Sequence, residues 1–198
     1  MECSRLIGTG KADASLVFGG YDSFRLGESA HSFPFSGDLD RPLMTRLATI
    51  VIIDGLHGDI PVSILHSTTP VLLDSTSPYF ELPEATCKEF ERTFDLEFDP
   101  ESGQFQANRS TRRRLRERNP KVRFKLAEAD GGVEVELPYA SFDLQIGSAL
   151  DDEDEMTYFP IKTTTNNQPS VLGRAFFQEA CVKIFSTSFA QFFFCQMA

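Results

Sequence analysis

The chain of 198 residues contains no tryptophan, only three histidines and only four cysteines. The cysteines have no Cys-x-x-Cys spacing, which argues against a zinc site, and the sequence predicts neither a metal nor another cofactor. One disulfide could form in an oxidising compartment, but the sequence does not identify the pair. The cysteines are Cys3, Cys87, Cys181 and Cys195, and the scattered histidines, each expected at a surface or turn, are His31, His57 and His66.

Long apolar runs are also missing. No stretch reaches the roughly 18 apolar residues that a membrane span requires, so we expect no membrane span. Residues 1–5 have no apolar core of the kind found in a signal peptide, so we expect no export signal in the chain as written. The net charge of −10 argues against a nucleic acid or an anionic membrane as the main partner.

Phenylalanine is abundant, with 19 residues, and many of them stand beside Val, Ile or Leu in short runs that favour strands. Turn signals such as Asp54-Gly55 and Asp130-Gly131-Gly132 recur along the chain. Residues 139–146 are expected to form a continuous strand. About ten strands and two short helices are predicted, which indicates an all-β barrel or sandwich in one domain.

One predicted helix lies within residues 82–94, where Cys87, Phe90 and Phe94 form an apolar stripe at helical spacing. Cys87 is therefore expected to be a core residue or half of a disulfide. No histidine lies near it in the sequence to activate it as a nucleophile.

Two charged blocks interrupt the strand pattern. Residues 109–118 contain six arginines, which indicate either an anion or nucleic-acid patch or a solvated helix face with Leu115 as its one inward residue. The second interpretation is favoured because no aromatic residues are interleaved and the chain is acidic. Residues 151–155 are five consecutive acids that lack the spacing and glycine of an EF-hand loop, so we expect a solvated loop there.

The segment 71–77 carries the clearest candidate for chemistry. The apolar residues 71–73 lead into Asp74, and Ser75, Thr76 and Ser77 follow directly. A buried strand that ends in this way would place a carboxylate on a tight turn among hydrogen-bond donors, an arrangement that can hold a reactive acid still. The alternative is a strand that simply ends in a polar turn.

Several separated blocks follow the order found in one protein family. They are Leu16 to Asp22, Leu73-Asp74-Ser75-Thr76, Pro78-Tyr79, Leu82-Pro83, Cys87 with Phe90 and Phe94, Asn119 to Val122, Leu137-Pro138-Tyr139, Phe142-Asp143-Leu144, Tyr158-Phe159-Pro160 and Val171 to Arg174. In this order the chain resembles the C-terminal lobe of a pepsin-like (family A1) aspartic endopeptidase of the secreted fungal type. The resemblance covers residues 16–198 and leaves residues 1–15 as an irregular lead-in.

The resemblance implies roles for five residues. Asp74 matches the second catalytic aspartate of the family, and Thr76 stands where glycine is commonest. Ser75 matches the residue whose hydroxyl ties the two active-site loops together, and Ser77 matches the one that hydrogen-bonds the outer oxygen of the aspartate. Gly173 matches a glycine behind the aspartate loop, where another backbone passes close by.

The sequence departs from the family in one consequential respect. Enzymes of this family hydrolyse peptide bonds with two carboxylates that share a proton, each on its own loop. Among these 198 residues, only Asp74 both follows an apolar strand and begins such a loop. The resemblance therefore implies a peptide or protein substrate, and it requires an N-terminal lobe or a second chain to complete the pair. Alone, the chain is expected to be inactive. The alternative is a non-catalytic peptide-binding module or a diverged half-protein.

Overall fold

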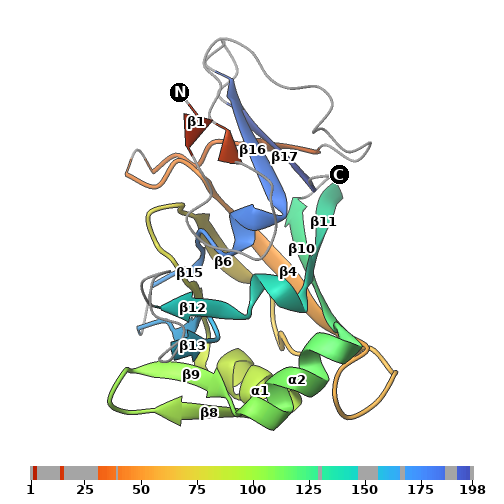
Figure 1. Ribbon diagram of the computed structural model, residues 1–198. Coiled ribbons are helices and arrows are strands. Elements are labelled where there is room, and N and C mark those ends of the chain that lie inside the picture. The colour runs from red at the N-terminus through yellow and green to blue at the C-terminus, as the bar shows by residue number, and fades with distance from the viewer. Residues whose placement is uncertain are drawn as a thin grey trace.

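The computed structural model describes residues 2–3, 14–15, 31–38, 40–128, 131–146, 156–165, 168–185 and 191–196. Within these ranges the chain is mostly strand, with two α-helices (Figure 1). The predicted all-β class is therefore confirmed. The strands are more numerous than the ten expected because many of them have only two to four residues. Two predicted segments, the block 16–22 and the acidic run 151–155, lie outside the described residues.

A mixed sheet of eight strands forms the centre of the fold. Its strands, in spatial order, are β11 (Gly131–Pro138), β10 (Lys121–Glu128), β4 (Met44–Ile53), β6 (Thr69–Leu73), β15 (Ser170–Leu172), β7 (Phe80–Leu82) and β14 (Ile161–Thr163), with β5 (Val62–Ser63) paired to β4. Buried and more exposed residues largely alternate along β11, as they do in a strand with one face on the core.

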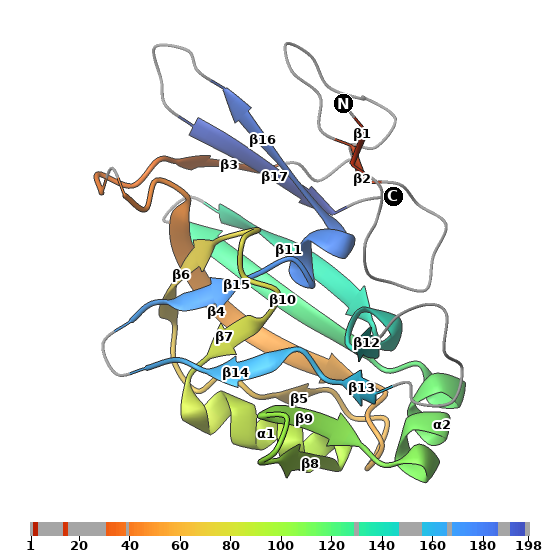
Figure 2. The same ribbon diagram turned by 60° about the vertical axis from the view of Figure 1, so that its left-hand side comes forward.

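Four smaller sets of strands surround the central sheet. They are β16 (Ala180–Phe185), β17 (Gln191–Gln196) and β3 (His31–Pro34), then β12 (Leu144–Ile146) with β13 (Met156–Tyr158), β8 (Leu96–Asp99) with β9 (Gln104–Ala107), and β1 (Glu2–Cys3) with β2 (Ala14–Ser15). Figure 2 shows the three-stranded set above the central sheet and the β8–β9 hairpin below it. Pro34 lies on the edge strand β3, as its missing N–H predicts.

The two helices form where the helical pattern predicts them, α1 at Glu84–Phe94 and α2 at Arg109–Arg118. The α1 stripe of Cys87, Phe90 and Phe94 is buried. Each helix ends at a residue with left-handed backbone, Asp95 or Asn119, whose N–H donates back into the last turn. At its start, α2 is capped by Asn108, which accepts a hydrogen bond from the Thr111 N–H at 2.9 Å.

The prediction of one strand over residues 139–146 is wrong in its first half. A single 3₁₀ turn, η2 (Tyr139–Ser141), comes before β12, and the Phe142 N–H donates to the Tyr139 carbonyl at 2.8 Å. The turn brings Asp143 against α2. Apolar alternation along the sequence could not reveal the turn, because Arg112, which pairs with Asp143, lies about 30 residues earlier in the chain.

Phenyl rings fill the centre of the core. Phe80 on β7 stacks on Phe124 at 5.4 Å between ring centroids and on Phe142 at 5.0 Å. Phe142 also stacks on Phe159, again at 5.0 Å. Each such pair adds roughly 0.5–1.5 kcal/mol to the gain from burial. In this way phenylalanine supplies the aromatic volume of a core that has no tryptophan.

The arginines of α2 do more than form a solvated face. Arg112 and Arg116 both donate from Nε to the Asp143 carboxylate at 2.6 Å, and the Asp143 side chain is only 5% exposed. Leu115 is buried as predicted, but Thr111 is buried beside it. The prediction of a single inward residue was therefore wrong. In addition, the buried Asp143 carboxylate draws two guanidinium groups toward the core.

We expect Asp143→Asn to lower the free energy of unfolding by about 2–3 kcal/mol, because Arg112 then lacks its buried counter-charge. This expected loss is smaller than the loss usually caused by breaking a buried ion pair, because Arg116 is half-exposed. Urea denaturation measures the loss. Glu117→Gln is the control, since that exposed carboxylate lies 3.9 Å from Arg113 and should contribute almost nothing. Equal losses in the two variants would contradict this assignment.

Candidate functional site

The segment 74–79 crosses over the end of a strand that comes much later in the sequence. Strand β15 lies between β6 and β7, parallel to the first and antiparallel to the second. The connection from β6 to β7 must therefore pass over the end of β15. Three backbone hydrogen bonds hold the connection there. The Asp74 N–H donates to the Leu172 carbonyl at 3.2 Å. The Gly173 N–H donates to the Tyr79 carbonyl at 3.0 Å, and the Arg174 N–H donates to the Ser77 carbonyl at 2.7 Å.

Gly173 is required by this crossing. A Cβ atom at position 173 would lie 2.3 Å from the Tyr79 carbonyl oxygen and 2.4 Å from that of Ser77. Both distances are well inside van der Waals contact, and the obstructing atoms belong to the backbone. The sequence prediction that another backbone passes close to this glycine agrees with the geometry.

Asp74 is a half-buried carboxylate with one oxygen held in place. Its Oδ1 accepts hydrogen bonds from the Thr76 backbone N–H at 2.8 Å and from Thr76 Oγ1 at 2.7 Å. The backbone bond is of the Asx-turn type, which fixes the direction of the side chain. Within the described residues, Oδ2 has no hydrogen-bond partner. A carboxylate fixed through one oxygen can use the other to accept a proton from a water molecule.

The remaining loop residues are arranged differently from the roles that the resemblance implies. Ser77 donates from Oγ to Glu81 Oε1 at 2.9 Å and accepts from the Tyr79 N–H at 3.3 Å. In the part of the chain that the structure describes, Thr76, not Ser77, supplies the hydroxyl on Asp74. Ser75 is exposed. The roles predicted for Ser75 and Ser77, and a catalytic role for Asp74, stay predictions.

Sequence reasoning missed the residues that support this loop from the side. The Tyr79 hydroxyl accepts from Gln104 Nε2 at 2.9 Å, and Lys162 Nζ lies 3.8 Å from the centre of the Tyr79 ring. Lys162 also lies opposite Glu81 in the parallel pairing of β14 with β7. These contacts depend on the order of strands in the sheet, so no pattern along the sequence could have identified them.

Cys87 is a free, buried thiol and not half of a disulfide. Its Sγ lies 3.4 Å from the Lys162 carbonyl oxygen and 3.6 Å from that of Leu82. Burial raises the pKa of the Cys87 thiol to about 11. Of the two sequence expectations, the core position is therefore the one that the structure supports. In the backbone pairing of β16 with β17, Cys181 lies opposite Cys195.

Other candidate sites are few among the described residues. His57 is half-exposed and pairs with Asp95 at 3.0 Å, and His66 is exposed, as expected for surface histidines. No group of three or more His, Cys, Asp or Glu side chains in the described ranges is placed to hold a metal ion. No described helix has the length and apolar character needed to cross a membrane.

We expect Gly173→Ala to destabilise the fold by at least about 2 kcal/mol, because the new methyl group forces the crossing backbones apart. Thermal and urea unfolding measure the effect. Gly37→Ala is the matched control, since a Cβ at position 37 meets nothing within 4 Å. A Gly173→Ala variant as stable as the control would show that the segment can move aside without cost.

The Cys87 thiol should react very slowly in the folded state. With a pKa of about 11, roughly one thiol in a thousand is ionised at pH 8. Because folding raises this pKa, the folded state holds the proton more tightly, and the associated stability is lost as pH rises toward 11. Alkylation of a variant with Cys3, Cys181 and Cys195 changed to Ser tests this. Equal alkylation rates with and without urea would contradict it.

Comparisons with known proteins identify the fold. No protein-family model matches the sequence, and no curated protein matches it either. The crystal structure of an aspartic proteinase from Irpex lacteus is similar, with a TM-score of 0.63 over 91% of this chain at 14% sequence identity. The match covers 51% of that proteinase, so the chain spans about half of its length. At so low an identity the likeness shows the fold alone, which is that of a single pepsin-like lobe.

Proposed function

We propose that this chain is one half of a pepsin-like aspartic endopeptidase of the secreted fungal type, with residues 16–198 as its C-terminal lobe and residues 1–15 as a lead-in. Asp74 is its catalytic aspartate. The observation that carries the proposal is the Asp74 carboxylate itself. It directly follows strand β6, whose Val71 and Leu73 are buried, is held by Thr76 through one oxygen and lies on the segment that crosses Gly173.

The chemistry follows from a pair of carboxylates. Two carboxyl groups that share one proton cannot both be ionised at close range, so one stays protonated while the other is charged. The charged group takes a proton from water, which attacks the peptide carbonyl, and the protonated group donates to the carbonyl oxygen. Asp74 supplies one of the two groups, and an N-terminal lobe or a second chain supplies the other.

The remaining loop residues have supporting roles in this proposal. Thr76 fixes Asp74 so that Oδ2 faces the shared proton and the water. Gly173 allows residues 74–79 to lie on the end of β15. The Ser77–Glu81 hydrogen bond attaches the same segment to β7. Ser75 is left exposed, where its hydroxyl can tie this loop to that of the partner lobe.

The test combines peptide cleavage with inhibitor binding. The purified 198-residue chain is incubated with denatured haemoglobin at about pH 4, where a carboxylate pair can share a proton, and its retention on immobilised pepstatin is measured. We expect retention without appreciable cleavage. Asp74→Asn should abolish retention, whereas Asp40→Asn, a change at an exposed site, should leave it intact.

Three other outcomes have definite meanings. Cleavage that rises with the square of chain concentration and disappears in Asp74→Asn would show that two copies supply the pair. Retention that is unchanged in Asp74→Asn would contradict the proposal and favour a non-catalytic peptide-binding module. A folded chain that neither binds pepstatin nor cleaves would refute the proposed function.

A further inference from the structure

Helix α2 concentrates positive charge in an acidic protein. Six of the 19 basic residues of the chain lie within its ten positions, although the net charge is −10. This feature is independent of Asp74 and of the proposed endopeptidase activity. It therefore needs its own explanation, from the contacts that each arginine makes.

The structure separates the six arginines into two groups. Three pair with carboxylates, since Arg112 and Arg116 share Asp143 while Arg118 pairs with Asp59. The other three face solvent. Of these, Arg113 has a side chain that is 78% exposed and lies 3.9 Å from Glu117, a weak pair at most.

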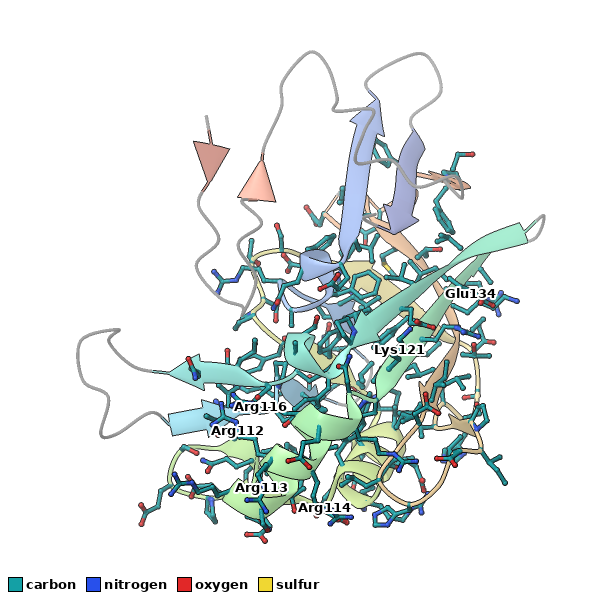
Figure 3. The ribbon with its side chains drawn as sticks, turned by 45° about the vertical axis from the view of Figure 1, so that its right-hand side comes forward. Arg112, Arg113, Arg114, Arg116, Lys121 and Glu134 are labelled. Carbon is teal, nitrogen blue, oxygen red and sulfur yellow. The ribbon has the colours of Figure 1, made fainter. Side chains whose placement is uncertain are left out.

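Arg109 and Arg114 are exposed and have no ion pair with any described residue. Figure 3 shows Arg113 and Arg114 on the outer side of α2, whereas Arg112 and Arg116 lie toward the β12–β13 side. We call Arg109, Arg113 and Arg114 the exposed arginine face. Among the residues that the structure describes, the six guanidinium groups of this helix pair only with the carboxylates of Asp143, Asp59 and Glu117, which leaves positive charge in excess there.

The exposed arginine face does not help α2 to fold. Arg109 and Arg113 are four residues apart, a spacing at which like charges repel on a helix. The first turn of α2 contains no acidic residue, and Arg109 within that turn lies at the positive end of the helix dipole. Helix stability would favour neutral or acidic side chains here, and a ligand that brings negative charge would relieve both effects.

We propose that the exposed arginine face binds an extended acidic segment of a polypeptide. Residues four apart on a helix are separated by about 6 Å along its axis, and alternate residues of an extended chain by about 6.8 Å. Carboxylates on alternate residues can therefore meet Arg109 and Arg113 in turn, each through the paired N–H groups of a guanidinium. Nucleic acid is disfavoured because α2 offers no aromatic side chain on which a base could stack.

Fluorescence anisotropy tests the proposal with a labelled peptide of about 12 residues in which Glu and Ser alternate, at about 50 mM salt, where charge interactions are weakly screened. The test variant changes Arg109, Arg113 and Arg114 to Gln. The control changes three other exposed basic residues, Lys88, Arg92 and Lys125, to Gln and so removes the same charge. We expect about tenfold weaker binding in the test variant and less than about twofold in the control.

The outcomes separate the proposal from its alternatives. The test variant should keep or raise the melting temperature of the parent, so loss of binding with a lower melting temperature would overturn the proposal. Equal weakening in the two variants would overturn it in favour of general charge attraction. Single-stranded DNA of the same charge that binds as tightly as the peptide would overturn it in favour of a general polyanion site. Absence of peptide binding to the parent chain would also overturn it.

Discussion

The close crossing of residues 74–79 over Gly173 is the constraint on which the candidate site depends. Backbone carbonyls of Ser77 and Tyr79 occupy the space that any side chain at position 173 would need. Hydrogen bonds on both sides of this contact fix where β6 ends and where β7 begins. Asp74 therefore lies on a segment clamped at both ends, and Thr76 has only to fix the direction of its carboxylate.

The core supports the crossing from below. Phe80, the first residue of β7, is completely buried and stacks on rings from β10 and from the turn after η2. A shift of β7 would therefore disturb several well-packed phenyl contacts at once. Directly after Phe142, Asp143 attaches α2 through two guanidinium groups. Packing thus holds the loop, while ion pairing holds the basic helix.

Local patterns in the sequence predicted the strand into Asp74 and the stripe of α1. These two features depend on neighbours within a few residues, which a sequence displays directly. The close backbone approach at Gly173 was predicted only through the family resemblance, because the obstructing carbonyls of Ser77 and Tyr79 lie far away in the sequence. The sequence could not predict the Ser77–Glu81 hydrogen bond, the position of the Lys162 ammonium group over the Tyr79 ring or the pairing of Asp143 with α2. Each depends on which strands lie side by side, and strand order is decided by packing across the whole chain.

The insertion of β15 between β6 and β7 also decides when the site can form. Leu72 pairs with Val171, about 100 residues later in the chain. During synthesis the β6–β7 connection must wait for most of the chain to emerge before its partner strand exists, and closing so long a loop is slow. Until then the space beneath Asp74 has no strand to fill it. The geometry of the carboxylate is therefore among the last features of the fold to be completed, although its sequence signal is among the clearest.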